Sequence, residues 1–416
     1  MSSQRSDVTV QKLRIFVISP WPMQTYQEKQ KGFDGSSEYR ILKGFVDNGH
    51  EVHLLVPKES NAPKDFSYSG IFFHEFKVPP IPLANRLISK FTRRLTNYFM
   101  FVLLSIKCFI SVMKTYGRPD VVYGYTSHGC VAAYIVTRFI RVPNITRLYG
   151  TPLYPYLSDL PRLFLTHFEE FLAFKLPCKY LIITNDASKG DVVARTLKVP
   201  FERVKYWMNG VNFAYDSDFD SQKFKEIRKI PDGAYIILWV GRLVKWKGID
   251  RLIKAIPAII SSNRKILALI VGDGKERKNL EYLSRELGIS EFVRFVGSVS
   301  HYDVANYMRV ADIFVSLQDF SNISSSLLEA MTYGMCIVTL NSGGTNEIIK
   351  NGQNAVLLEY SELDNLSRVI LSLLNNENLK KELGGKAQKY AIEHFLTWNE
   401  RVKMEIELVE GLFKRR

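Results

Sequence analysis

The sequence predicts a parallel α/β fold in two successive units. Short, nearly continuous apolar segments alternate with helical stretches along the chain, as in parallel sheets whose strands are buried between two layers of helices. At 416 residues the chain is long enough for two or three domains. A polar and charged stretch at 214–233 separates the first series of apolar segments from the second and is predicted to be an interdomain linker. Together these observations predict two Rossmann-like halves.

The first series of elements occupies the predicted N-terminal domain, residues 1–213. Its first strand is RIFVIS at 14–19, and a glycine-bearing loop that contains Gly35 leads into a helix at 38–47. Four more strands are predicted at 49–56, 120–125, 144–149 and 179–185. Each is a short apolar run, which is the pattern of a strand covered on both faces.

The second series occupies the predicted C-terminal domain, residues 234–395. Its helices are predicted at 249–260 and 275–287. Its strands are predicted at 234–243, 265–274, 292–297, 311–317, 336–340 and 355–359. Within the last segment, 396–416, an amphipathic helix at 400–413 is a candidate to cross back to the N-terminal domain.

The composition is that of an ordinary globular protein. Apolar residues make up 46% and charged residues 24%, which excludes a disordered, collagen-like or coiled-coil chain. The four cysteines lie far apart without the spacing of a zinc site, so we expect neither a disulfide framework nor a structural metal, and a reducing cytosol fits. The first apolar segment is too short for a signal peptide with its cleavage site.

Positive charge is concentrated in one part of the chain. The net charge is +14, and residues 76–158 contain eleven lysines and arginines but a single acid, Asp120. Such a block indicates an anionic partner, which is a lipid surface, a phosphate-bearing substrate or nucleic acid. No DNA- or RNA-binding motif accompanies the charge, so nucleic acid is not expected.

The segment 82–114 is the candidate membrane contact. At helical spacing its first part has an apolar face beside a basic stripe of Arg86, Lys90, Arg93 and Arg94. This pattern suits an anionic bilayer surface, where each lysine or arginine contributes about 1 kcal/mol. The alternative is an ordinary domain helix whose apolar face lies in the core. The longest apolar run, 98–113, is shorter than the roughly 20 residues that a membrane-spanning helix needs.

Candidate binding residues follow the strands of the C-terminal domain. In open α/β sheets the carboxyl ends of the strands face the ligand crevice. After the first strand comes GRLVKWKG, in which Gly241 precedes Arg242 and Lys247; the two cations can reach one diphosphate, or form a solvated basic loop. Gly272, in VGDG after the next strand, would let a ligand approach the backbone.

A serine-rich helix start comes next, in SNISSSLLEAM at 321–331. Ser324 or Ser325 is the predicted N-cap, and the helix N-terminus offers free N–H groups and partial positive charge to a phosphate. Glu329 follows within the first turns, where it can accept hydrogen bonds from ribose hydroxyls or be an ordinary surface glutamate. Gly343 and Gly344, in SGGTNE, precede another helix and add free backbone amides.

Taken together, these motifs resemble those of the retaining GT-B glycosyltransferases of family 4. That family carries G-R-L-x(3)-K-G, I-V-G-D-G, F-x-G, E-x(7)-E and G-G-x-x-E, and the chain shows GRLVKWKG, IVGDG, FVG, SNISSSLLE and GGTNE in the same order. Asn209-Gly210-Val211-Asn212 also resembles the N-G-V-D that precedes the family's linker. The N-terminal half matches more weakly, through the Gly35 loop and GHEV at 49–52. The resemblance implies a GT-B fold, in which two Rossmann-like domains face each other across a cleft.

The resemblance also implies roles for single residues. Arg242 and Lys247 would neutralise the diphosphate of a nucleotide-sugar donor and stabilise the leaving nucleotide without a metal. Glu329 would bind the ribose, and the amides around Ser324 and Gly343 would contact phosphate or sugar. The other donor-binding candidates are Gly35, Gly241, Gly272, Ser321, Asn322, Ser325 and Gly344.

The chain departs from the family pattern at two positions. Ser321 stands where the first E-x(7)-E glutamate is expected, so either Asp319 substitutes for it or Ser321 and Asn322 bind sugar hydroxyls as neutral partners. The histidine that many relatives carry before the glycine that ends the fourth N-terminal strand is replaced by Tyr149. The acceptor-side candidates are Tyr149, Gly150 and His128. For His128, a purely structural role is as open as a role in binding the acceptor.

Two overlapping D-x-D triplets at 216–220 form a pattern that binds metal in other glycosyltransferases. A calcium loop would need glycine and glutamate where this chain has Ser221 and Ile227. Because the triplets lie in the predicted linker, we interpret them as solvated charge. We therefore expect no metal and no other cofactor.

The sequence as a whole predicts a retaining, metal-independent glycosyltransferase that uses a nucleotide-sugar donor. Its acceptor is predicted to be lipid-linked or a glycan, in the synthesis of a cell-surface polysaccharide or glycoconjugate. The predicted location is the cytoplasm, with peripheral attachment to the membrane. Two alternatives stay open, a catalytically silent nucleotide-sugar-binding scaffold subunit and an epimerase of GT-B fold.

Overall fold

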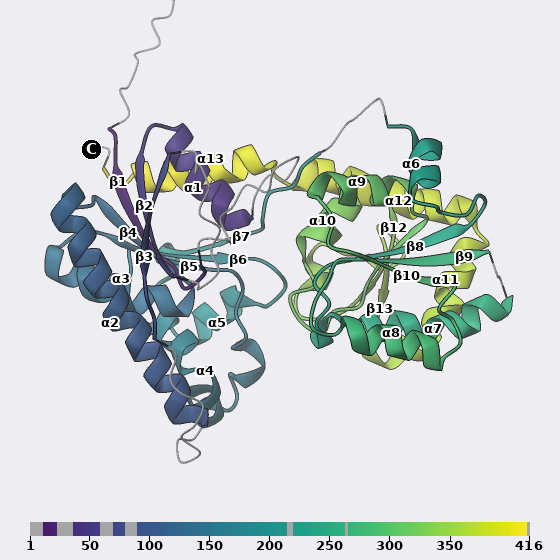
Figure 1. Cartoon of the computed structure of the whole chain (residues 1–416), viewed down its shortest axis with the longest axis horizontal. Coiled ribbons are helices and arrows are strands. Elements are labelled where there is room, and N and C mark those ends of the chain that lie inside the picture. Colours follow the sequence, from purple (N-terminus) through teal and green to yellow (C-terminus); the bar gives the residue numbers. More distant parts are fainter. Residues whose placement is uncertain are drawn as a thin grey trace, which may run out of the picture.

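The computed structural model describes residues 11–22, 36–58, 70–79, 90–213, 219–262 and 265–413. In this part of the chain, two parallel sheets form the centres of two α/β domains that lie side by side (Figure 1). The candidate residue Gly35 and the segment 81–89, which contains the start of the predicted membrane contact, lie outside the described residues.

The N-terminal sheet has seven strands in the order β3-β2-β1-β4-β5-β6-β7. They are β1 (Arg14–Ile18), β2 (Glu51–Pro57), β3 (Ile71–Phe76), β4 (Val121–Tyr125), β5 (Asn144–Leu148), β6 (Tyr180–Thr184) and β7 (Val204–Trp207). The sequence did not predict β3 and β7. Both are edge strands whose side chains are largely half-buried, so they lack the continuous apolar signal of the central strands.

Helices cover both faces of this sheet. They are α1 (Ser37–Asp47), α2 (Lys90–Tyr116), α3 (Thr126–Ile140), α4 (Leu160–Lys175) and α5 (Gly190–Thr196). Side chains of β1 alternate between the faces. Ile15 and Val17 pack with α1 and with the distant helix α13 (Trp398–Glu410), whereas Phe16 and Ile18 pack with α2 and α3. This alternation places two apolar layers on either side of one sheet.

The helix α2 takes up part of the predicted membrane segment. Its inner face is in the core, and Tyr98 and Phe109 are each 1% exposed. Arg94, predicted as part of a basic stripe, forms an ion pair with the buried Glu169 of α4. The expectation that Arg94 faces an anionic surface is therefore corrected: its charge is neutralised within the domain.

The C-terminal sheet has six strands in the order β10-β9-β8-β11-β12-β13. They are β8 (Tyr235–Val240), β9 (Ile266–Val271), β10 (Val293–Gly297), β11 (Ile313–Ser316), β12 (Cys336–Leu340) and β13 (Val356–Leu358). Its helices are α7 (Ile249–Ser262), α8 (Arg277–Glu286), α9 (His301–Val310), α10 (Ser325–Thr332), α11 (Leu366–Leu374) and α12 (Glu377–His394). In β8, Ile237 and Trp239 face α7 and α11, while Ile236 and Leu238 face α10 and α12.

The predicted linker contains a helix of the second domain, α6 (Ser221–Ile227). Its Phe224 packs edge-on against Tyr307 of α9, with ring centroids 5.1 Å apart. Asp220, the last acid of the D-x-D triplets, caps this helix by accepting a hydrogen bond from the Lys223 N–H. The prediction of a linker over all of 214–233 is corrected accordingly, because Phe224 and Ile230 of this otherwise polar segment are buried in the core of the second domain. The other two acids, at 216 and 218, lie outside the described residues.

The helix α13 returns to the N-terminal domain and packs against α1 (Figure 1). Its Glu405 Oε2 lies 3.0 Å from Arg401 Nη2 and 3.6 Å from Arg147 Nε of β5, and all three side chains are buried. Ile406 and Val409 complete the apolar layer between α13 and the sheet. A charged cluster and an apolar seam thus join this helix to a domain that is otherwise formed by the first half of the chain.

Candidate active site

The loop after β8 carries two predicted cations. Residues 245–247 form a single 3₁₀ turn, and Gly248 follows with φ +66° before α7 begins. A Cβ on Gly248 would lie 2.2 Å from the carbonyl oxygen of Leu317, so glycine lets the turn pack against the end of β11. This packing places Lys247 beside the segment that follows β11.

Lys247 is half-buried, and its Nζ donates a hydrogen bond to Gln318 Oε1 at 2.5 Å. Burial, and after it the nearby Arg242 charge, lower the pKa of Lys247 to about 8, although the Asp186 carboxylate opposes both effects. Arg242 itself is exposed. The two cations are thus close enough to repel each other, and an anion between them would relieve that repulsion.

Gly241 and Gly272 pack against each other. A Cβ on Gly272, whose φ is +130°, would lie 1.8 Å from the Gly241 carbonyl oxygen. The Gly241 N–H also donates to the carbonyl of Val271 at 3.0 Å. From the sequence we expected Gly272 to admit a ligand to the backbone; in the structure the close approach is between the two loops themselves.

The N-terminus of α10 lies next to the lysine. Ser324 is the N-cap, and its Oγ accepts from the Leu327 N–H at 3.3 Å, while Ser325 is exposed in the first turn. Gln318 Nε2 donates to the same Ser324 Oγ. Gln318, 1% exposed, therefore links Lys247 to the helix start.

Asn322 has an internal role instead of the predicted contact with sugar. It is 0% exposed, and its amide donates to Thr339 Oγ1 at 2.9 Å and to the Leu340 carbonyl at 2.7 Å. Ser316 Oγ donates to its amide oxygen. All its polar atoms are used to fix the loop before α10, so Asn322 is removed from the donor-binding candidates.

Glu329 is buried within α10, and its Oε1 lies 3.0 Å from His301 Nε2. His301 is the first residue of α9, after the strand end FVG. This histidine belongs to none of the sequence motifs and was therefore not predicted. The carboxylate that the resemblance assigns to the ribose is thus oriented by a neighbouring imidazole.

Both domains meet at these loops. The Gly344 N–H donates to the Ala187 carbonyl at 2.9 Å, and the Ile323 N–H donates to the Asp186 carbonyl at 3.2 Å. Gly343 has φ +61°, and a Cβ there would lie 1.9 Å from the same Ala187 oxygen. The segment that follows β6 in the N-terminal domain therefore contacts two of the predicted donor loops directly.

The acceptor-side candidates fall into two places. Gly150 lies against the side chain of Asp186, beside the donor loops, and Tyr149 packs edge-on against Trp21 at 5.1 Å. His128 lies elsewhere, at the start of α3, where the Tyr98 ring packs edge-on at 5.1 Å and burial lowers its pKa. The structure thus joins Gly150 to the candidate site and places His128 in an aromatic environment next to α2.

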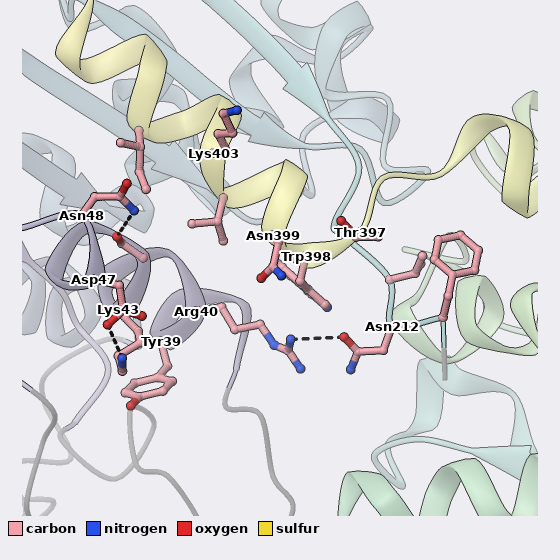
Figure 2. A pocket seen from close by; sticks show the side chains of 15 residues that line it. Tyr39, Arg40, Lys43, Asp47, Asn48, Asn212, Thr397, Trp398, Asn399 and Lys403 are labelled. Carbon is pink, nitrogen blue, oxygen red and sulfur yellow. Dashed lines mark hydrogen bonds and ion pairs between the residues drawn. The ribbon is translucent and has the colours of Figure 1, made fainter. Parts of the chain in front are cut away.

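A cavity of about 760 Å³ lies between α1 and the start of α13, where the chain passes between the two domains (Figure 2). Arg40 Nη1 donates to Asn212 Oδ1 at 3.4 Å, and the Arg40 guanidinium lies 4.8 Å from the Trp398 ring centroid. Val211 and Thr397 pair as an isolated bridge. The N-G-V-N motif lies where the chain leaves the N-terminal domain. It therefore pairs with the segment just before α13, where the chain returns to that domain.

Residues 37–215 match the family described as Glycosyltransferase Family 4, and residues 220–390 match Glycosyl transferases group 1. The chain belongs to the family 4 glycosyltransferases. It is therefore a glycosyltransferase that uses a nucleotide-sugar donor, as the motifs predicted.

Two relatives of this glycosyltransferase and one solved structure show the extent of the likeness. N-acetyl-α-D-glucosaminyl L-malate synthase from Bacillus anthracis is 23% identical over 88% of this chain and 90% of that protein. An uncharacterized glycosyltransferase from Methanocaldococcus jannaschii is 32% identical over 42% of this chain, and that match spans 45% of its own length. Sucrose-phosphate synthase from Thermosynechococcus elongatus has the same fold, with a TM-score of 0.76 at 17% identity over 97% of this chain and 99% of that one. The predicted GT-B fold is confirmed.

Proposed function

We propose that this protein is a retaining glycosyltransferase that needs no metal ion and transfers its sugar to a lipid-linked acceptor at the cytoplasmic face of a membrane. The proposal for the donor rests on the pair Arg242 and Lys247. A leaving nucleoside diphosphate gains negative charge in the transition state, and fixed cations in a partly buried site stabilise that charge without reorganisation. The half-buried lysine beside the N-terminus of α10 supplies such a group.

A ligand panel tests the donor and the metal independence. Thermal melting of the full chain is followed with UDP, GDP, ADP and their common sugar conjugates, with magnesium and with EDTA. A ligand at 100 times its Kd adds about 2.7 kcal/mol, which shifts the melting temperature measurably. We expect one nucleotide to stabilise the protein equally in EDTA. Stabilisation that disappears in EDTA would contradict metal independence, and loss of transfer in Arg242→Ala is the matching activity test.

The proposal for the acceptor rests on the outer face of α2. Phe99, Leu103 and Ile110 are 51%, 63% and 43% exposed on this face, and exposed Lys107 and Lys114 lie among them. Phe/Leu/Ile side chains with interspersed lysines are the pattern of a helix that lies in an anionic membrane interface. Residues 91–116 are long and apolar enough to cross a membrane by length and composition. Since the inner face packs on the sheet, surface attachment is proposed instead.

Vesicle sedimentation tests this attachment. The full chain is mixed with vesicles that contain about one third phosphatidylserine, at low and high salt. We expect binding at low salt that Leu103→Asp abolishes and that Lys107→Glu weakens, because the first removes apolar insertion and the second removes attraction to the head groups. Tyr282→Asp, at an exposed aromatic position on α8 of the other domain, is the matched control. Equal sedimentation of Leu103→Asp and the control would refute the proposal.

A further inference from the structure

The carboxyl group of Asp186 lies where the two domains meet. The residue follows β6 of the N-terminal domain and is buried, with 8% of its surface exposed. Its Oδ2 accepts a hydrogen bond from Ser321 Oγ of the C-terminal domain at 2.6 Å, and its Oδ1 accepts from the Ser188 N–H at 3.1 Å. A buried carboxylate of one domain therefore reaches into the donor loops of the other.

No cation forms an ion pair with this carboxylate among the residues that the structure describes. The aspartates that follow strands β9 and β11 of the C-terminal domain are neutralised, in the pairs Asp273–Arg277 and Asp319–Arg251. Asp186 has hydroxyl and amide donors, and burial raises its pKa. Asp186 and Lys247 also contact the same short segment, because Lys247 Nζ donates to Gln318 Oε1 and Ser321 Oγ donates to Asp186 Oδ2. The Asp186 charge accordingly raises the pKa of Lys247, so the carboxylate and the ammonium face one site.

The backbone around Asp186 is arranged to leave room for it. Gly150 has φ +88°, and a Cβ there would lie 2.2 Å from Asp186 Oδ2. Ser321 has φ +55°, a left-handed conformation that is uncommon for serine. Strained or glycine-dependent backbone that surrounds a buried polar group is typical of binding sites. Here both features converge on the same oxygen atom.

We propose that Asp186 binds hydroxyl groups of the donor's sugar, and that the Ser321 hydroxyl takes the place of a sugar hydroxyl in the free protein. This inference rests on the proposed nucleotide-sugar donor. The sugar of such a donor is attached directly to the diphosphate, so a carboxylate that shares a site with Lys247 lies next to the sugar's position. A serine O–H and a sugar O–H donate to a carboxylate in the same way.

The inference differs from both substitutes that the sequence suggested for the missing glutamate of the E-x(7)-E motif, Asp319 or the neutral pair Ser321 and Asn322. Asp319 receives hydrogen bonds from Arg251 Nη2 at 2.5 Å and from the Tyr360 hydroxyl at 3.2 Å. The Asp319 carboxylate is therefore engaged by Arg251 and Tyr360, and its charge is neutralised there. Asp186 supplies a carboxylate at Ser321 from the opposite domain.

Calorimetric titration of the full chain tests the inference. The probes are UDP, GDP and ADP, each compared with its glucose or mannose conjugate, so that the sugar's contribution is the ratio of two Kd values. Asp186→Asn is expected to leave the Kd of the nucleoside diphosphate within about twofold and to weaken the nucleotide-sugar about 10- to 100-fold, as for a lost hydrogen bond to a charged group. Asp319→Asn is the matched control, with no selective loss of the sugar's contribution.

Further variants separate this role from a simple contact between the domains. Ser321→Ala removes the competing hydroxyl and is expected to tighten nucleotide-sugar binding. If the Ser321–Asp186 hydrogen bond only held the two domains together, Ser321→Ala would instead weaken nucleotide-sugar binding as Asp186→Asn does. If Asp186→Asn has a lowered melting temperature, Asp186→Ser, which removes the carboxylate without adding an amide, allows the same comparison of nucleoside diphosphate and nucleotide-sugar binding. Equal weakening of nucleotide and nucleotide-sugar, or no weakening of either, would overturn the inference while the proposed function stands. Failure of every nucleotide to bind the unaltered protein would overturn both.

Discussion

Replacing Lys247 by methionine should separate stability from ligand binding. Methionine keeps a long apolar stem but carries no charge, so the variant does not bury an ammonium group. In the unaltered protein the pKa of Lys247 falls from 10.5 to about 8 on folding, chiefly through burial. A lowered lysine pKa means that the folded state binds the proton less tightly than the unfolded state, and stability therefore rises as the pH rises toward and above 8.

The size of this effect follows from the two pKa values. Between pH 7 and pH 10 the free energy of unfolding of the unaltered protein should rise by about 2 kcal/mol relative to Lys247→Met. At pH 7 the gain from removing the charge is partly offset, because Gln318 Oε1, which is buried, loses its donor at a cost of about 1–3 kcal/mol. The pH-dependent difference is unaffected by that cost, so it is the quantity to measure.

Urea unfolding at pH 7, 8, 9 and 10 provides the measurement, with the two proteins compared at each pH. Lys245→Met, at the exposed lysine of the same turn, is the matched control and should show no such pH-dependent difference. At pH 7 the Lys247→Met variant should also bind nucleoside diphosphate far more weakly than the control. A stability difference between Lys247→Met and the unaltered protein that stays constant from pH 7 to pH 10 would refute the reasoning.

Three further predictions follow from the same structure. Nucleoside diphosphate binding should weaken about tenfold from pH 7 to pH 9 as Lys247 loses its proton, and Lys247→Arg should abolish this dependence in calorimetry. Gly272→Ala should lower the melting temperature sharply, because its Cβ would meet a carbonyl oxygen at 1.8 Å; Gly385→Ala, in open space on α12, should raise it slightly. Glu405→Gln should cost about 3–5 kcal/mol in urea unfolding because it leaves two buried arginines without their carboxylate, and a loss no larger than that of the exposed Glu407→Gln would contradict this.

The sequence predicted those parts of the fold that have a local pattern. Central strands such as β1 and β8 are continuous apolar runs. The start of α10 is likewise local, because a serine at the cap position, Ser324, is enough to indicate it. The half-buried edge strand β7 and the polar helix α6 have no such pattern, so neither was predicted.

The candidate site likewise contains residues that a local sequence pattern identifies and residues that only the folded structure brings together. Arg242, Lys247 and Glu329 belong to motifs within one segment, and the sequence identified them. Asp186 and Ser321 are 135 positions apart and meet only because two domains touch, which no local spacing indicates. Asn322 was misassigned for a related reason, since its buried partners lie on β12, a separate strand.

The return of α13 to the first domain also affects how the protein is made. A ribosome releases the N-terminal domain first, yet part of the apolar layer over its sheet, from Ile406 and Val409, and the carboxylate for Arg147 come from α13. At about 5–20 residues per second, the roughly 190 residues between β7 and α13 take roughly 10–40 s to synthesise. During that interval the face of the nascent domain that α1 covers is incomplete, and a buried arginine lacks its counter-charge. The second domain therefore has time to fold before the first one is finished, and the first is completed only after α13 has been synthesised.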